Sequence, residues 1–173
     1  REEEEVAKKL ERAAEESRRL HEESKRDHER ATDEIRRKAE ATLRELKRVI
    51  DEIERLADER DKEDVRRRAE ELLRRVKKAS EDIVKELRDL VERSLRRDKE
   101  IVDRSKKVLD EVIREVDVEE IRRRVETLER ENRKAEEESR DKVRKSERRL
   151  EELNKRHEDL VRELEERLER KRK

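Results

Sequence analysis

The stretch VDVEEI, residues 116–121, decides how this chain of 173 residues folds. Val116 and Val118 are two positions apart, which is about 200° around an α-helix, so one unbroken helix cannot keep both on its apolar face. A turn between two helices must therefore fall here. Asp117 is a suitable N-cap for the following helix, and Glu120 can complete a capping box with it. Val116 and Ile121 can then pack together as a hydrophobic staple.

An earlier stretch resembles this helix start. DKEDVRRRAE, residues 61–70, matches DVEEIRRRVE, residues 117–126, and so predicts a second N-cap at Asp61. We expect one domain, residues 1–173, with helices at about 1–59, 62–115 and 118–173.

Short junctions make consecutive helices antiparallel neighbours. The predicted fold is all-α, a long antiparallel up-down-up three-helix bundle with helices of roughly 55 residues. The alternative is one rod-like helix that associates with other copies. The phase break at residues 116–118 counts against the rod, whereas the lack of a glycine C-cap favours it.

Composition supports helices and little else. The chain has 55 Lys and Arg, 55 Asp and Glu, and no Gly, Pro, Cys, Met, Phe, Tyr or Trp. Lys, Arg, Glu, Leu and Ala are good helix formers, and there is no Gly or Pro to mark a turn. High charge with few apolar residues is also typical of disordered chains, but the regular spacing of the apolar residues argues against disorder.

The last third shows this spacing most clearly. Its inward positions follow one another at steps of three or four, with a mean of about 3.6, the period of a straight helix. The bundle should therefore be nearly untwisted. These positions are Ile121, Val125, Leu128, Asn132, Ala135, Ser139, Val143, Ser146, Leu150, Leu153, His157, Leu160, Leu164 and Leu168.

Uncharged polar residues lie on or beside these inward faces. The chain has only seven Ser, three Thr, two Asn and three His, and Thr127 alone looks marginal. We therefore expect buried hydrogen-bond networks between helices. The candidate residues, which include one aspartate, are Ser17, His21, Ser24, His28, Thr32, Thr42, Ser80, Ser94, Asp98, Ser105, Asn132, Ser139, Ser146, Asn154 and His157.

Antiparallel packing aligns these candidates in groups. Residue x of the first helix should face about 121 − x on the second and lie level with about x + 112 on the third. The predicted groups are His21 and Ser24 with Asp98 and Asn132, His28 with Ser94 and Ser139, Thr42 with Ser80 and Asn154, Ser17 with Ser105, and Thr32 with Ser146.

Asp98 is the informative member, because a buried carboxylate is costly unless donors satisfy it. His21 and Asn132 can donate to it. Such networks fix helix register, because a slipped helix leaves buried polar groups unpaired at about 1–3 kcal/mol each. Buried histidines should also have lowered pKa values, which would make the protein less stable in acid.

Catalytic and metal-binding interpretations are weaker. His21 and His28 share a helix face and could ligate a metal with Asp98, but there is no HExxH or Cys/His spacing, and Ser and Asn are poor zinc ligands. A His/Ser/Asp set suggests nucleophilic catalysis, yet no glycine-rich oxyanion loop accompanies it. We expect no enzyme activity, no metal and no cofactor.

Charge and hydropathy give no sign of a nucleic acid or membrane partner. The net charge is zero with both signs interspersed, and there are no aromatic side chains on which bases could stack. No apolar run exceeds two residues, so no membrane span or targeting signal is predicted and the chain should be soluble.

The chain resembles a computationally designed three-helix bundle with buried hydrogen-bond networks. The features that carry this resemblance are the missing residue types, the two similar helix starts, the thirds of nearly equal length and the inward Ser, His, Thr and Asn. The resemblance covers the whole chain, and it lies in composition and residue placement rather than in shared sequence motifs. It departs from the usual pattern in lacking Gly or Pro at the turns.

The resemblance implies a structural scaffold with no natural substrate, no required partner and no cellular address beyond recombinant cytoplasmic expression. The alternative is a helical module that binds a second copy or a designed helical partner. Its buried histidines could make such a module responsive to pH.

Overall fold

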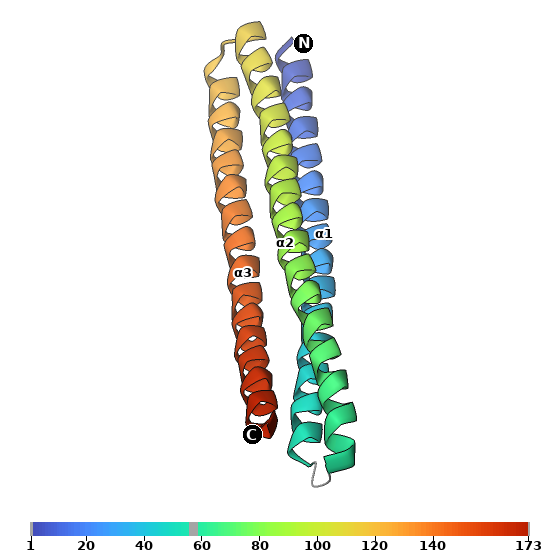
Figure 1. Ribbon diagram of the computed structural model, residues 1–173. Helices are drawn as coiled ribbons and strands as arrows, with labels where there is room; N and C mark the ends of the chain where they lie inside the picture. The colour runs from blue at the N-terminus through green and yellow to red at the C-terminus, as the bar shows by residue number, and fades with distance from the viewer. Residues whose placement is uncertain (1, 56–58, 173) are drawn as a thin grey trace. The chain divides into compact units, whose positions relative to one another are not determined.

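The chain forms three α-helices. The computed structural model describes residues 2–55 and 59–172, apart from the side chains of residues 59–62, 171 and 172. The helices are α1 (Glu2–Glu54), α2 (Glu59–Glu115) and α3 (Glu119–Arg172), coloured in chain order from blue to red in Figure 1. Within the described ranges there is no strand. The all-α three-helix prediction is confirmed.

The junction between α2 and α3 lies where the phase break predicts it. The Val116 N–H donates to the Val112 carbonyl at 3.1 Å and continues the helical bonding pattern of α2. Val116 and Val118 both pack against the apolar cluster that contains Ile121. Both valines can contact this cluster because the chain reverses between them.

Asp117, however, is not the N-cap that the sequence predicts. The first helical bond of α3 runs from the Arg122 N–H to the Val118 carbonyl at 3.0 Å, so α3 begins one residue later than expected. The Asp117 carboxylate instead accepts two hydrogen bonds from the Arg122 guanidinium, at 2.6 and 2.9 Å. A bidentate, charge-assisted pair competes well with a single bond to a backbone N–H.

The predicted first junction is misplaced. α1 ends at Glu54 rather than near residue 59, and α2 begins at Glu59, so Asp61 lies inside a helix instead of capping it. Glu59 and Arg60 are good helix formers and no Gly or Pro precedes Asp61, so nothing in their chemistry delays the helix. Residues 56–58 lie outside the described residues.

The helices group into two compact units, each a three-helix bundle. The first unit comprises residues 1–30 and 90–145, and the second comprises residues 31–89 and 146–173. In each unit, a contact made further along α1 falls at a lower residue number in α2, so α2 runs antiparallel to α1. Contacts between α2 and α3 follow the same rule, so α3 runs antiparallel to α2. The up-down-up order is therefore observed in both units.

The first unit has its own apolar core, built from all three helices. Leu10 is 2 % exposed and Val112 is 1 % exposed, so both side chains are almost fully removed from water. Burying a side chain of this size contributes about 2 kcal/mol. The buried cluster consists of Val6, Leu10, Ala14, Leu109, Val112, Ile121, Val125 and Leu128.

The second unit has a separate apolar core. Leu46 of α1 and Leu164 of α3 are fully buried here, and Val76 of α2 is 2 % exposed. The cluster consists of Leu46, Ile50, Ile53, Val65, Ala69, Leu72, Val76, Leu164 and Leu168. Each unit therefore combines an apolar cluster with the polar contacts described next.

Candidate functional site

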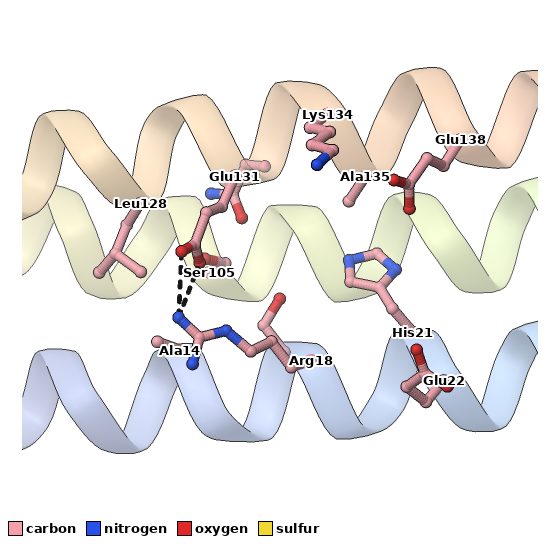
Figure 2. A pocket seen from close by; sticks show the side chains of 12 residues that line it. Ala14, Arg18, His21, Glu22, Ser105, Leu128, Glu131, Lys134, Ala135 and Glu138 are labelled. Atoms are coloured by element: carbon pink, nitrogen blue, oxygen red, sulfur yellow. Dashed lines mark hydrogen bonds and ion pairs between the residues drawn. The ribbon is translucent and has the colours of Figure 1, made fainter.

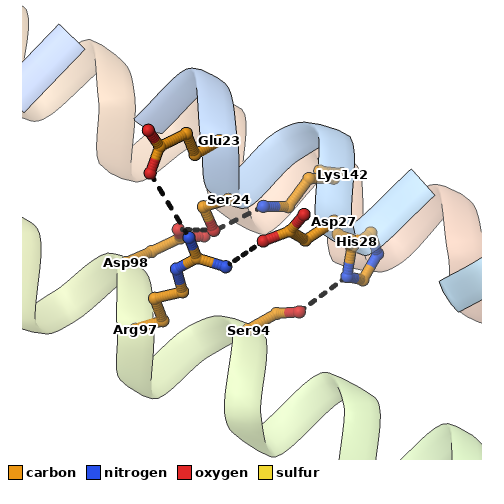
Figure 3. A network of polar contacts seen from close by, with 8 residues as sticks. All are labelled: Glu23, Ser24, Asp27, His28, Ser94, Arg97, Asp98 and Lys142. Carbon is orange, nitrogen blue, oxygen red and sulfur yellow. Dashed lines mark hydrogen bonds and ion pairs between the residues drawn. The ribbon is translucent and has the colours of Figure 1, made fainter. Parts of the chain in front are cut away.

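Asp98 is the centre of the polar contacts in the first unit. Its side chain lies on α2 and is buried. Ser24 of α1 donates to its Oδ1 at 2.6 Å, and Ser139 of α3 donates to its Oδ2. The Lys142 ammonium, also on α3, donates to the same Oδ2 at 3.1 Å. One carboxylate thus links all three helices (Figure 3).

The donors to Asp98 differ from those that the sequence predicts. We expected His21 and Asn132, but both carboxylate oxygens are bound by other residues. The Asn132 Nδ2 and the His21 Nε2 are buried and have no hydrogen-bond partner. Lys142 was not predicted to take part, because lysine normally marks the solvated face of a helix. Its long aliphatic stem lets the ammonium reach inward from the edge of that face.

The charge state of Asp98 follows from these contacts. Burial alone would raise its pKa, but hydrogen bonds from Ser139 and Ser24 and the nearby Lys142 ammonium more than offset burial. The pKa of Asp98 therefore lies below its ordinary value. The carboxylate is ionised at neutral pH and acts as an acceptor only.

His28 forms a second contact between α1 and α2 in the first unit. Its Nδ1 lies 2.7 Å from the Ser94 hydroxyl, and the side chains of both residues are buried (Figure 3). Burial, assisted by the positive charge of Lys142 and opposed by Asp98, lowers the pKa of His28 to about 4. Burial likewise lowers the pKa of His21, although the Asp98 carboxylate opposes it. Both imidazoles are therefore neutral at pH 7.

Charged side chains cover the outside of this network. Arg97 of α2 contacts Asp27 at 2.7 Å and Glu23 at 4.0 Å, both on α1 (Figure 3). The hydrogen bond from Arg97 lowers the pKa of Asp27. Exposed pairs of this kind add little stability, so the buried contacts are the ones that discriminate between registers.

The second unit contains its own polar contacts. The Ser80 hydroxyl on α2 lies 3.0 Å from the His157 Nδ1 and 3.4 Å from the Asn154 Oδ1, both on α3. Burial lowers the pKa of His157, whose Nε2 has no partner. The Thr32 and Ser146 hydroxyls, on α1 and α3, lie 3.4 Å apart. The sequence named His157 as a network candidate and grouped Ser80 with Asn154, but it did not pair Ser80 with His157, which lies about one turn further along α3.

Thr42 does not join this group as expected. Its hydroxyl donates to the Lys38 carbonyl of its own helix at 2.9 Å. Thr127, which looked marginal, bonds in the same way to the Arg123 carbonyl and is exposed. Threonine in a helix often makes this local bond, which satisfies the hydroxyl without a partner helix.

Ser17 and Ser105, which were predicted to lie together, line one pocket in the first unit. The pocket has a volume of about 300 Å³, and Asn132 and His21 are also among the residues that line it. Figure 2 shows His21 and Ser105 at this pocket. Sequence reasoning missed this pocket. The signal was a set of small residues at one level of the three helices, which leaves space unfilled: Ala14, Ser17, Ser105 and Ala135.

The chemistry of the site is that of hydrogen bonding. In the part of the chain that the structure describes, no three His, Asp or Glu side chains are placed to hold a metal ion. None of the described helices has the length and apolar character needed to cross a membrane. The buried contacts consist of hydroxyl, imidazole, amide, carboxylate and ammonium groups.

Comparison with known proteins finds matches among solved structures alone. No protein-family model matches this chain, and no curated protein matches it. Among solved structures, a protein described as "Computationally designed three helix bundle" matches with a TM-score of 0.43 and 16 % identity. The match covers 97 % of this chain and 82 % of that protein.

Proposed function

We propose that this chain is a designed structural scaffold without a natural biochemical activity, in which buried polar contacts specify how the helices pair. The observation that carries this proposal is the Asp98 carboxylate, which accepts hydrogen bonds from Ser24 of α1 and Ser139 of α3. Three helices meet at one ionised group: α2 contributes the carboxylate, and α1 and α3 each contribute a hydroxyl that donates to it.

This arrangement penalises wrong pairings. If α1 moved along α2 by one turn, Ser24 would leave Asp98, His21 or His28 would come level with the carboxylate, and the contact between His28 and Ser94 would be lost. Each buried polar group left unpaired costs about 1–3 kcal/mol, and an unpaired carboxylate costs more. Apolar contacts alone discriminate less, because one leucine can replace another in a shifted register.

The distribution of residue types supports a designed origin. Eight residue types, glutamine among them, are absent, and the exposed faces consist almost entirely of Glu, Lys, Arg and Asp. Among the side chains that the structure describes, ten polar or charged ones are buried, and nine of these are the rare Ser, Thr, Asn and His residues. Natural surfaces scatter these residue types freely, whereas this chain reserves most of them for the interior.

The test is to make the network apolar and follow the assembly state. The parent should give one species near 21.4 kDa in light scattering coupled to size-exclusion chromatography. The triple variant Ser24→Ala/Asp98→Leu/Ser139→Ala should stay helical but give several masses and poorly dispersed amide NMR signals. A matched variant of exposed residues on the same helices, Arg26→Ala/Lys99→Leu/Arg140→Ala, should behave like the parent. A single, well-ordered 21.4 kDa species for the apolar triple variant would contradict the proposal.

A second function, self-association or binding of a helical partner, has one observation in its favour. Leu95 and Ile113 are 40 % and 39 % exposed and lie five turns apart on one side of α2. Exposed leucine and isoleucine on one face can pack against a second copy. A parent mass that doubles with concentration and returns to 21.4 kDa in Leu95→Lys/Ile113→Lys would favour this function over the monomeric scaffold.

A further inference from the structure

The middle of the first unit receives little apolar packing from α1. The first unit contains residues 1–30 of this helix, and its buried side chains beyond Leu10 are only those of Ala14, Ser24 and His28. Polar contacts therefore hold α1 against the other helices at this level. A change that breaks these contacts meets few apolar contacts that could keep the unit closed.

Two imidazoles in this part of the unit are poorly placed to carry a charge. The His21 Nε2 is buried and has no hydrogen-bond partner, so the N–H that protonation adds to the ring would find no acceptor. His28 is 2 % exposed, and its Nδ1 lies 2.7 Å from the Ser94 hydroxyl, a neutral group (Figure 3). An imidazolium in either position would be a buried charge without a counter-charge of its own.

The carboxylate that could neutralise such a charge is already bound to another cation. The Lys142 ammonium donates to the Asp98 Oδ2 at 3.1 Å, and Ser24 donates to the Oδ1 at 2.6 Å. Burial is the main cause of the lowered pKa of both imidazoles, and the Lys142 charge adds to it while Asp98 opposes it. Protonation of the imidazoles would therefore gather several positive charges around one carboxylate.

The remaining charges near the two rings lie in solvent. Glu138 of α3 acts on His21, and Glu29 of α1 acts on His28. Both glutamates are exposed, so water screens their attraction for an imidazolium. Arg97 of α2 is paired with carboxylates of α1 on the outside of the network (Figure 3). None of these groups replaces Asp98 as a buried counter-charge.

The second unit differs in both respects. Its buried histidine is His157, whose pKa is lowered by burial and not by a nearby positive charge. Here α1 contributes large buried apolar side chains, namely Ile35, Leu46, Ile50 and Ile53. One protonated imidazole in this unit would therefore act against a larger set of apolar contacts.

We propose that the first unit is an acid-operated device, in which protons on His21 and His28 open the unit around Asp98 while the second unit stays folded. Lys142 makes the unit sensitive by holding the carboxylate that would otherwise neutralise the histidines. Opening uncovers the apolar cluster that contains Leu10 and Val112. This device goes beyond the scaffold role, because the scaffold needs the closed state alone.

Amide hydrogen exchange of the full chain at pH 7.5 and pH 5 tests the order of opening, after correction for the intrinsic exchange rates. The pKa of His28 is about 4 in the folded protein and about 6.5 in the open state. Protection of the amides in the first unit should therefore fall about thirtyfold. Protection in the second unit should fall much less. Asp98 stays ionised at pH 5, because its pKa lies below its ordinary value.

Four variants assign the response. Lys142→Gln leaves Asp98 free to pair with an imidazolium, so the fall in protection between pH 7.5 and pH 5 should shrink to about tenfold or less, although the variant is less stable at pH 7.5. Lys142→Arg keeps the charge and should respond like the parent. Lys145→Gln removes an exposed lysine of the same helix and should also respond like the parent. His157→Asn should leave the response of the first unit unchanged.

Three outcomes would overturn the proposal. Equal loss of protection in both units would mean that the chain responds to acid as one body. A loss in Lys142→Gln as large as in the parent would show that the lysine does not keep Asp98 from the histidines. If Lys142→Gln does not fold, His21→Asn/His28→Asn still decides where the response arises, and a thirtyfold fall that persists in its first unit would exclude these histidines.

Discussion

The Ser24 hydroxyl lies 2.6 Å from the Asp98 Oδ1, while Ser139 and Lys142 occupy the other oxygen of the same carboxylate. Ser24 and Asp98 are therefore fixed relative to each other across α1 and α2. A hydroxyl that donates to a buried carboxylate forms a charge-assisted bond, which is stronger than a bond between neutral groups. Removal of either partner should therefore destabilise the whole group of contacts around Asp98.

The first prediction concerns Asp98→Ala. This change leaves the Ser24 and Ser139 hydroxyls without their acceptor and removes the carboxylate that the Lys142 ammonium contacts. It should lower the free energy of unfolding by about 3 kcal/mol. Urea denaturation at pH 7.5 measures the loss.

The apolar triple variant provides the contrast. Ser24→Ala/Asp98→Leu/Ser139→Ala also removes the two hydroxyls that Asp98→Ala leaves without an acceptor and fills the space with a leucine, while Lys142 stays, so it should lose less stability than Asp98→Ala although it changes more residues. Equal or greater loss in the triple variant would show that the carboxylate contributes net stability rather than specificity of pairing.

The second prediction concerns acid. The pKa of His28 is about 4 in the folded protein and about 6.5 in the unfolded chain. Between these values the unfolded chain binds more protons, so stability is fully present above about pH 6.5 and falls as the pH drops toward 4. Between pH 7.5 and pH 5, His28 alone should cost about 2 kcal/mol.

Denaturant midpoints at these two pH values check the acid prediction. His21→Asn/His28→Asn should lose much less stability on acidification than the parent. The pKa of Asp98 lies below its ordinary value, so its own contribution is lost only in stronger acid and does not enter the comparison. Equal losses in parent and variant would mean that these histidines do not set the acid response.

The third prediction concerns the apolar core of the second unit. Leu46→Ala and Leu164→Ala each remove a fully buried side chain and should cost about 3 kcal/mol, from lost burial and the cavity that remains. Leu95→Ala, at a position 40 % exposed, should cost well under half as much. Thermal or urea unfolding of the three variants measures the difference, and similar losses would contradict the burial assigned to these leucines.

The fourth prediction concerns the start of α3. Asp117→Ala removes the charged pair with Arg122 and any capping oxygen, but the Val118 carbonyl still accepts the first helical bond. The helix should therefore begin at the same residue, as measured by backbone chemical shifts. If the first turn of α3 unwinds in Asp117→Ala but not in Glu119→Ala, Asp117 acts as a cap after all.

Much of the fold could be predicted because the spacing of the apolar residues shows which side of each helix faces inward. Val116 and Val118 mark the second junction through a break in that phase, and the break does not depend on turn-forming residues. No comparable break lies before Asp61. There, local similarity to a true helix start suggested the wrong residue, because a favourable cap residue can equally well occur inside a helix.

The position of each polar contact along the helices could be predicted, but not which two residues form it. Helix alignment brings Ser24 near Asp98, His28 near Ser94 and, on the third helix, Ser146 near Thr32. It cannot choose between neighbours one turn apart, so His157 was missed as a partner of Ser80. It also treats Lys142 as a surface residue, because spacing does not reveal how far a flexible side chain reaches.

The contacts from Ser24 to Asp98 and from His28 to Ser94 lie one turn apart on the same pair of helices. A force that pulls α1 along its axis past α2 would load both contacts together, since neither can follow the motion without breaking. Apolar side chains can slide past one another turn by turn, whereas these directional bonds give way within a fraction of an ångström. Under mechanical shear the first unit should therefore resist stiffly and then yield abruptly.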